Sequence, residues 1–176
     1  MKNLNELKQS LPDYAKDIKI NLSNILAEDQ NSELSQHQVL GVALASALAT
    51  KEKQVIWAIE NEARKTLSET EINGVKAATS IMAMNNIYYR FTHLTENKEY
   101  AKKPANLRMQ IIASHGIDKN DFEMCCLAVS IINGCGMCID SHEKKLIKVG
   151  ISENSVQTIA RIAAVINAFS FVISVN

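Results

Sequence analysis

Two cysteines in the last third of the chain could open and close a disulfide bond. Cys135 and Cys138 are separated by two residues, so their sulfur atoms could bond without unfolding the chain. His142 follows Cys138 by four residues, and Glu123 precedes Cys135 by twelve. An imidazole and a carboxylate can carry the protons that thiol chemistry takes up and releases. These residues predict a thiol-based redox enzyme with Cys138, Cys135, His142 and Glu123 as catalytic residues.

The sequence around the cysteines predicts that a helix begins at the pair. Asn133-Gly134 is typical of a helix end, so a new helix is expected to start near Cys135. Free amides and the dipole at a helix N-terminus can lower a cysteine pKa from about 8.5 to roughly 3.5–7.5. Cys138 is one turn further along, and His142 another turn beyond it on the same face.

Glu123 belongs to the helix expected from about Asp121 to Ile132. This boundary places Glu123 in the first turn. The Asn-Gly break lets the helix fold back beside its successor, so the carboxylate could reach the cysteine pair. There it could orient His142 or relay a proton.

Three questions stay open at the level of these residues. The helix dipole favours Cys135 as the attacking sulfur, whereas the one-turn spacing from His142 favours Cys138. The four residues could instead ligate zinc, although structural zinc sites draw ligand pairs from two separate loops and the chain has no second pair. The cysteines could also be buried and inert.

Composition limits the class of protein. Lysine plus arginine and aspartate plus glutamate both total 19, so the formal net charge is zero. The chain therefore lacks the excess of basic residues that would predict binding to nucleic acid or to an anionic membrane surface. The low net charge gives little electrostatic resistance to self-association, which favours a homo-oligomer. The sequence lacks the glycine-rich phosphate loop that would indicate a flavin or nicotinamide site. We therefore expect no bound cofactor, and we expect an external dithiol to reduce the cysteine pair.

Cysteine usage and the chain ends predict a cytoplasmic protein. The polar segment Met1–Leu11 lacks the apolar stretch of a secretory signal, and Ile159–Val175 is expected to be a buried C-terminal helix. All four cysteines lie within fourteen positions, unlike a structural disulfide framework. Cys125 and Cys126 are expected to pack in the core, although one of them could face the site.

The pattern of apolar residues predicts an all-α fold, and no alternating run indicates a strand. We expect one domain over residues 1–176, with a scaffold half at 1–100 and a half at 101–176 that carries the cysteines. A weak repeat at an offset of fifty residues suggests that the halves are related. Expected helices and helix starts are Asp13–Ala27, Leu34–Ala49, a helix capped by Thr50 and ending at Leu67, a helix opened by the capping box Ser68–Glu71 that runs to Met84 and continues or restarts to Leu94, Leu107–Ala113, Asp121–Ile132, Cys135–Gly150 and a last helix capped by Ser152.

The sequence contains a further set of motifs. These are Met82-x-Met84-Asn85-Asn86-x-x-Tyr89-Arg90, Leu107-Arg108-Met109-x-Ile111-Ile112-Ala113, Phe122-Glu123, Ala128-Val129-Ser130, Ile132-Asn133-Gly134-Cys135, Cys138, His142-Glu143 and Val149-Gly150. Together they resemble the alkyl hydroperoxidase D (AhpD) family, within the carboxymuconolactone decarboxylase-like superfamily. The resemblance runs from about residue 38 to the C-terminus.

The resemblance implies an all-helical, usually trimeric antioxidant enzyme. It implies that Cys138 is oxidised to a sulfenic acid, that Cys135 is the proton donor and disulfide partner, and that Glu123 and His142 form a proton relay. It also implies reduction of alkyl hydroperoxides and electron transfer from a lipoylated dehydrogenase-complex subunit to the peroxiredoxin AhpC. Met137 departs from the mycobacterial pattern, which has a histidine there. The superfamily also leaves open a decarboxylase or isomerase reaction.

Overall fold

The computed structural model describes residues 1–27 and 33–176, and this part of the chain contains helices and no strands. The predicted all-α class is therefore confirmed. The elements are α1 (Leu4–Gln9), η1 (Asp13–Ala15), α2 (Lys16–Leu26), α3 (Gln36–Thr50), α4 (Lys53–Ala63), α5 (Glu69–Leu94), α6 (Glu99–Lys102), η3 (Gln110–Ala113), α7 (Lys119–Ile132), α8 (Gly136–Lys148) and α9 (Glu153–Ser174).

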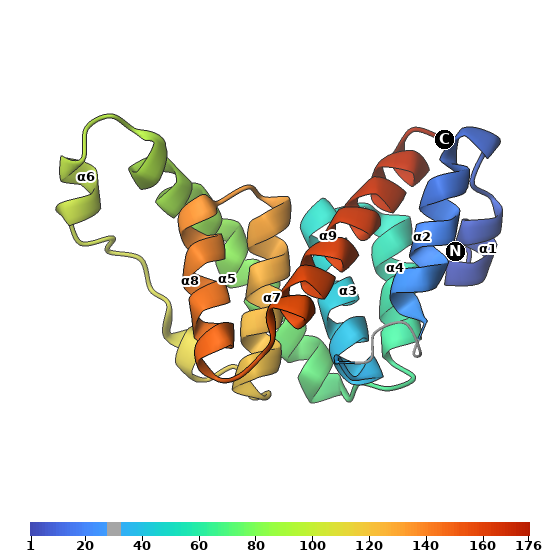
Figure 1. Ribbon diagram of the computed structural model, residues 1–176, viewed down its shortest axis with the longest axis horizontal. Helices are drawn as coiled ribbons and strands as arrows, with labels where there is room; N and C mark the ends of the chain where they lie inside the picture. Colours follow the sequence, from blue (N-terminus) through green and yellow to red (C-terminus); the bar gives the residue numbers. More distant parts are fainter. Residues whose placement is uncertain (28–32) are drawn as a thin grey trace.

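Helix α3 lies at the centre of the core. Every residue from Val39 to Ala47 is buried, and the helix packs against α4, α5, α7 and α9. Five of these nine residues are alanine, glycine or serine, and small side chains let neighbouring helices approach closely. Three helices, α5, α7 and α8, form a group on one side of α3, and this group carries the cysteine pair (Figure 1).

Helix α9 is long and apolar enough to cross a membrane by length and composition alone, a test that the core helix of a globular protein also passes. Its buried face, which includes Ile159, Ile162, Ile166 and Phe169, packs against α2, α3 and α7. These contacts agree with the expectation of a C-terminal core helix. The outward face keeps Phe171 exposed.

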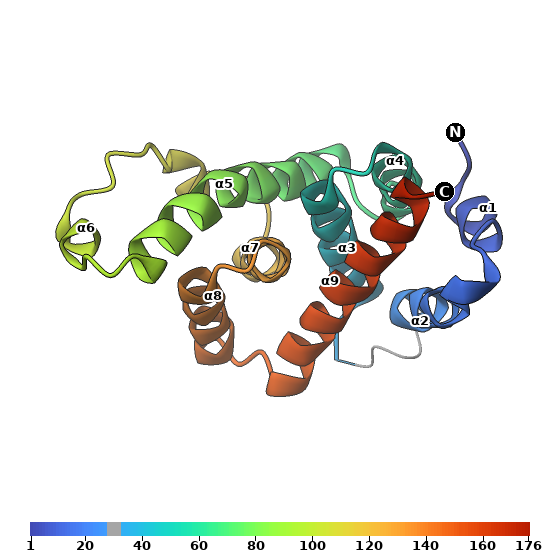
Figure 2. The ribbon, with the colours of Figure 1, turned by 90° about the horizontal axis from the view of Figure 1, so that it is seen from above.

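Helix α5 begins with the predicted capping box. The Ser68 hydroxyl accepts from the Glu71 amide, and the Glu71 carboxylate accepts from the Ser68 amide. The helix then runs without interruption to Leu94, so the expected segment after Met84 continues the helix and does not restart it. Its C-terminal end and α6 extend away from the rest of the molecule (Figure 2).

The local predictions at Thr50 and over 107–113 were wrong. Thr50 does not cap a helix; it is the last residue of α3, and its hydroxyl donates to the Ala47 carbonyl. Glu52 caps α4 instead, through a side-chain oxygen that accepts from the Gln54 amide. The expected helix over 107–113 is shorter and is a 3-10 turn over 110–113. The division into two halves stays a prediction, although helices from both expected halves pack together.

Candidate active site

The two candidate redox cysteines form a disulfide bond, and their Cα atoms are 5.3 Å apart. Cys135 is the N-cap residue of α8, which places Cys138 in the first helical turn, as predicted. The preceding turn depends on Gly134, whose φ of +65° lies in the left-handed region. Through this turn α7 and α8 fold back on each other, and they pack side by side.

The two sulfur-bearing residues differ in accessibility. Cys135 is fully buried, and Cys138 retains 6% of its surface. Cys138 also lines a cavity of about 240 Å³, and Cys135 does not. A molecule entering this cavity therefore meets Cys138 first.

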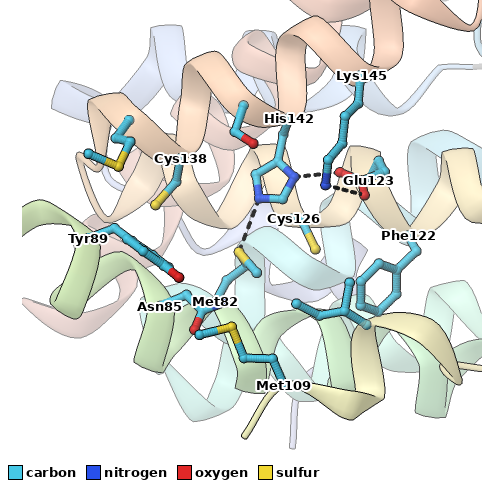
Figure 3. A pocket seen from close by; sticks show the side chains of 13 residues that line it. Met82, Asn85, Tyr89, Met109, Phe122, Glu123, Cys126, Cys138, His142 and Lys145 are labelled. Carbon is cyan, nitrogen blue, oxygen red and sulfur yellow. Dashed lines mark hydrogen bonds and ion pairs between the residues drawn. The ribbon is translucent and has the colours of Figure 1, made fainter. Parts of the chain in front are cut away.

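The cavity lies between α5, α7 and α8 (Figure 3). Most of its wall is apolar, with a few polar groups around Cys138. The lining residues are Met82, Asn85, Tyr89, Met109, Ile112, Phe122, Glu123, Cys126, Met137, Cys138, Ser141, His142 and Lys145.

Glu123 and His142 are in direct contact in this cavity. The Oε2 atom of Glu123 lies 2.5 Å from Nδ1 of His142, and its Oε1 atom accepts from Nζ of Lys145 at 2.9 Å. Glu123 is the fifth residue of α7, because the helix starts at Lys119 and not at Asp121. It therefore lies in the second turn, not the predicted first turn, and it still reaches the site.

Burial and hydrogen bonding act in opposite directions on Glu123. Burial alone would raise the pKa of this carboxyl, but its hydrogen bonds and electrostatic interactions with His142 and Lys145 outweigh burial and lower the pKa below its ordinary value. The carboxylate is then charged at neutral pH and can only accept hydrogen bonds.

This charge state fixes the hydrogen on His142. Because Glu123 only accepts, Nδ1 of His142 must carry the hydrogen of their contact. The other ring nitrogen, Nε2, lies 3.3 Å from the Met82 sulfur. Nε2 is thus the atom through which the buried imidazole can gain or lose a proton on the cavity side.

A buried polar network joins α5 to the corner before the cysteines. Nδ2 of Asn86 donates to the Ser130 hydroxyl at 2.9 Å, and Oδ1 of Asn86 accepts from Nδ2 of Asn133 at 2.9 Å. Nη1 of Arg90 donates to the Asn133 carbonyl at 2.6 Å. These bonds hold α5 against the Asn-Gly turn that positions Cys135.

The remaining cysteines are free thiols in the core. Cys125 and Cys126 are buried, and burial raises the pKa of both thiols well above the ordinary value. Core packing was the expectation for both. Cys126 also lines the cavity, so one of the pair does face the site.

The zinc alternative has no ligand set in the described part of the chain. Across residues 1–27 and 33–176 no group of three or more histidine, cysteine, aspartate or glutamate side chains could hold a metal ion. Glu123 and His142 contact each other, and the two cysteines are bonded together.

Residue patterns alone missed three groups of the site. Lys145 follows His142 by three residues, so the helical spacing could have placed it on the same face. Met82 and Asn85 come from α5, far away in the sequence. Both belong to a motif of the family resemblance, and only the tertiary structure shows the contact of Met82 with His142.

Comparison with known proteins places the chain in a family. Residues 98–172 match the model of the carboxymuconolactone decarboxylase family. The alkyl hydroperoxide reductase AhpD of Coxiella burnetii (strain Dugway 5J108-111) is 56% identical over 167 residues, which cover 95% of this chain and 94% of that protein. The chain belongs to the AhpD family. Its similarity to other AhpD proteins spans almost the whole length: that of Maricaulis maris (strain MCS10) is 51% identical over 98% of both chains, and that of Rhodopseudomonas palustris (strain BisA53) is 50% identical over 92% of this chain and 88% of its own.

Proposed function

We propose that this AhpD-family protein is a thiol-dependent peroxidase that reduces alkyl hydroperoxides through Cys138 and Cys135. The observation that carries the proposal is the asymmetric cysteine pair, in which only Cys138 lines a cavity shared with a hydrogen-bonded histidine and glutamate. The apolar part of the wall suits an alkyl chain. Relatives that are about half identical are named alkyl hydroperoxide reductases.

The proposed reaction has two oxidative steps. The Cys138 thiolate attacks the terminal oxygen of the hydroperoxide, the O–O bond breaks, and Cys138 becomes a sulfenic acid. The departing alkoxide takes a proton, supplied through Nε2 of His142, and leaves as an alcohol. The Cys135 thiol then attacks the Cys138 sulfur, water leaves, and the disulfide forms.

The reductive half of the cycle needs an external dithiol. Its thiolate attacks the accessible Cys138 sulfur, and Cys135 leaves as a thiolate at the start of α8, where the helix dipole stabilises negative charge. We propose a lipoyl group of a dehydrogenase-complex subunit as the donor and the peroxiredoxin AhpC as a second acceptor of electrons. We also propose that the enzyme works in the cytoplasm as a homotrimer, with no metal and no bound cofactor.

The name of the matched family model favours one alternative, a decarboxylase or isomerase reaction. That chemistry has no need of two neighbouring thiols. An interaction module without enzymatic activity is the remaining alternative, and it would leave the thiols unchanged by hydroperoxide.

A peroxidase assay tests the proposal. Consumption of tert-butyl hydroperoxide is measured with lipoylated carrier protein, thioredoxin or glutathione as the electron donor. We expect turnover with the lipoylated carrier and none with Cys138→Ser. Absence of turnover with every donor, together with retention of all thiols, would rule out a peroxidase.

A further inference from the structure

One buried polar group in the cavity has no partner. Asn85 retains only 4% of its surface, and its Oδ1 atom forms no hydrogen bond within the described residues. A buried amide oxygen without a partner costs about 1–3 kcal/mol relative to a bonded one. Its presence therefore needs an explanation outside the packing of the fold.

Asn85 faces the place where Cys138 is accessible. It lines the same cavity, as do Met82 and Tyr89, one turn before and after it on α5. Figure 3 shows these three side chains projecting from α5 toward the cavity, with Cys138 and His142 on the helix opposite. The side chain that carries the unpaired oxygen thus lies in the wall of the volume that a bound molecule would fill.

The neighbouring asparagine shows how a structural amide behaves in this helix. Asn86 is fully buried, and its side chain bonds both Ser130 and Asn133. Asn85 and Asn86 point about 100° apart on the helix, so one faces the α7–α8 corner and the other faces the cavity. Within the described part of the protein, both side-chain polar atoms of Asn86 are hydrogen-bonded, and Oδ1 of Asn85 is not.

We propose that the Asn85 amide positions the hydroperoxide for attack by Cys138. This inference rests on the proposed peroxidase function and assigns a binding role within it. Oδ1 accepts a hydrogen bond from the O–H group of the hydroperoxide, and the alkyl chain lies against Met109 and Ile112. The hydrogen bond holds the terminal oxygen near the Cys138 sulfur.

The proposed bond is compatible with the reaction balance. The hydrogen that Asn85 accepts stays on the terminal oxygen, which becomes the hydroxyl of the sulfenic acid. The proton for the alkoxide comes from elsewhere, through His142. Asn85 therefore neither gains nor loses a proton, as its neutral amide requires.

The test uses the Asn85→Leu variant, because leucine is similar in size to asparagine and has no polar group. It measures separately the oxidation of the thiols by hydroperoxide and the reduction of the disulfide. We expect the single-turnover rate of the reduced protein with tert-butyl hydroperoxide to fall about tenfold or more, because the transition state loses one buried hydrogen bond. Reduction of the disulfide by dithiothreitol, and reaction of the reduced protein with the disulfide reagent 4,4′-dithiodipyridine, should stay within about twofold, because neither reagent carries a hydroperoxide O–H.

Stability provides the matched control. Asn85→Leu should unfold at the same denaturant concentration as the parent protein or at a higher one, whereas Asn86→Leu should unfold at a lower one because it leaves Ser130 and Asn133 unpaired. If the leucine variant does not fold, Asn85→Ala replaces it in the same rate measurements. An unchanged hydroperoxide rate, or an equal loss in all three reactions, would overturn the role of Asn85. Failure of the parent protein to consume hydroperoxide would instead overturn the peroxidase function.

Discussion

The sulfur atoms of Cys135 and Cys138 have different surroundings, and these surroundings assign them different tasks. Cys138 lines the cavity, while Cys135 is sealed at the N-cap of α8. From the sequence, the helix dipole favours Cys135 as the attacking sulfur, whereas the spacing from His142 and the family resemblance predict Cys138. Accessibility favours Cys138, because a reagent cannot react with a sulfur that it cannot reach.

Single substitutions of the two cysteines should give different products. Cys138→Ser should abolish hydroperoxide turnover. Cys135→Ser should leave a sulfenic acid on Cys138, because no resolving thiol remains. Trapping with dimedone followed by peptide mass spectrometry locates the oxidised sulfur. Cys125→Ser is the control and should keep full turnover; dimedone on Cys135 in the Cys138→Ser protein would reverse the assignment.

Glu123 should make the stability of the protein depend on pH. Its folded-state pKa is lowered, so its charge stabilises the folded protein fully above the ordinary carboxyl pKa of 4.5. The contribution is lost as the pH falls through the lowered folded-state value. Glu123→Gln should therefore reduce the free energy of unfolding at pH 7 by about 1–3 kcal/mol, because it removes a charged partner from His142 and Lys145.

Urea unfolding of Glu123→Gln and the parent protein across pH 3–7 checks this expectation. The difference between the two proteins should shrink toward acid. Glu96→Gln removes the same charge from an exposed position and should change little at any pH. A difference that grows toward acid would show that the carboxylate destabilises the folded state.

Helix ends decide where the reactive groups lie. The turn between α7 and α8 holds Gly134 at a φ of +65°, and a side chain added there would meet no atom within 4 Å. The cost of a larger residue is therefore conformational and not steric.

Gly134→Ala should lower the free energy of unfolding by about 1–2 kcal/mol. Gly136→Ala is the matched control two residues later, within α8, where an added side chain also meets nothing within 4 Å. Alanine favours the helix there, so stability should hold or rise by up to about 1 kcal/mol. Equal destabilisation of both variants in urea unfolding would contradict this account of the turn.

Local patterns predicted the helices better than the contacts between them. The capping box at Ser68, the Asn-Gly break and the Ser152 cap are short-range signals, and each is present in the structure. The expected cap at Thr50 was wrong because the extended apolar run keeps α3 helical through that residue.

Contacts across the cavity depend on how helices far apart in the sequence pack together. Met82 and His142 are sixty residues apart, and no local pattern joins them. Nor could spacing distinguish Asn85 from Asn86, because only the packing of the helices shows that Asn86 faces the α7–α8 corner and Asn85 faces the cavity. The sequence did predict that Glu123 could reach His142, because only the short Asn133-Gly134 connection separates their two helices.

The whole molecule leaves an apolar strip exposed at one end. Ile87, Phe91 and Leu94 are at least half exposed, and their spacing places them on one face of the projecting end of α5. Phe91 contacts the exposed Tyr100 ring at 5.2 Å between centroids. A strip of this kind on a chain with zero net charge favours contact with another copy.

Phe91→Glu should therefore lower the molecular mass measured by light scattering from that of the predicted trimer. Phe171→Glu, which changes another exposed phenylalanine near the end of α9, is the comparison and should keep the mass. A monomeric parent protein would contradict the predicted assembly, and a loss of mass only in Phe171→Glu would move the interface to α9.

The central claim is that one accessible sulfur and one sealed sulfur form a reversible redox pair. The most direct test treats the fully reduced protein with one equivalent of tert-butyl hydroperoxide and maps every cysteine by mass spectrometry. The account predicts that two thiols per chain disappear, that Cys135 and Cys138 are joined, and that Cys125 and Cys126 stay free. Four intact thiols, or oxidation that falls on Cys125 or Cys126, would contradict it.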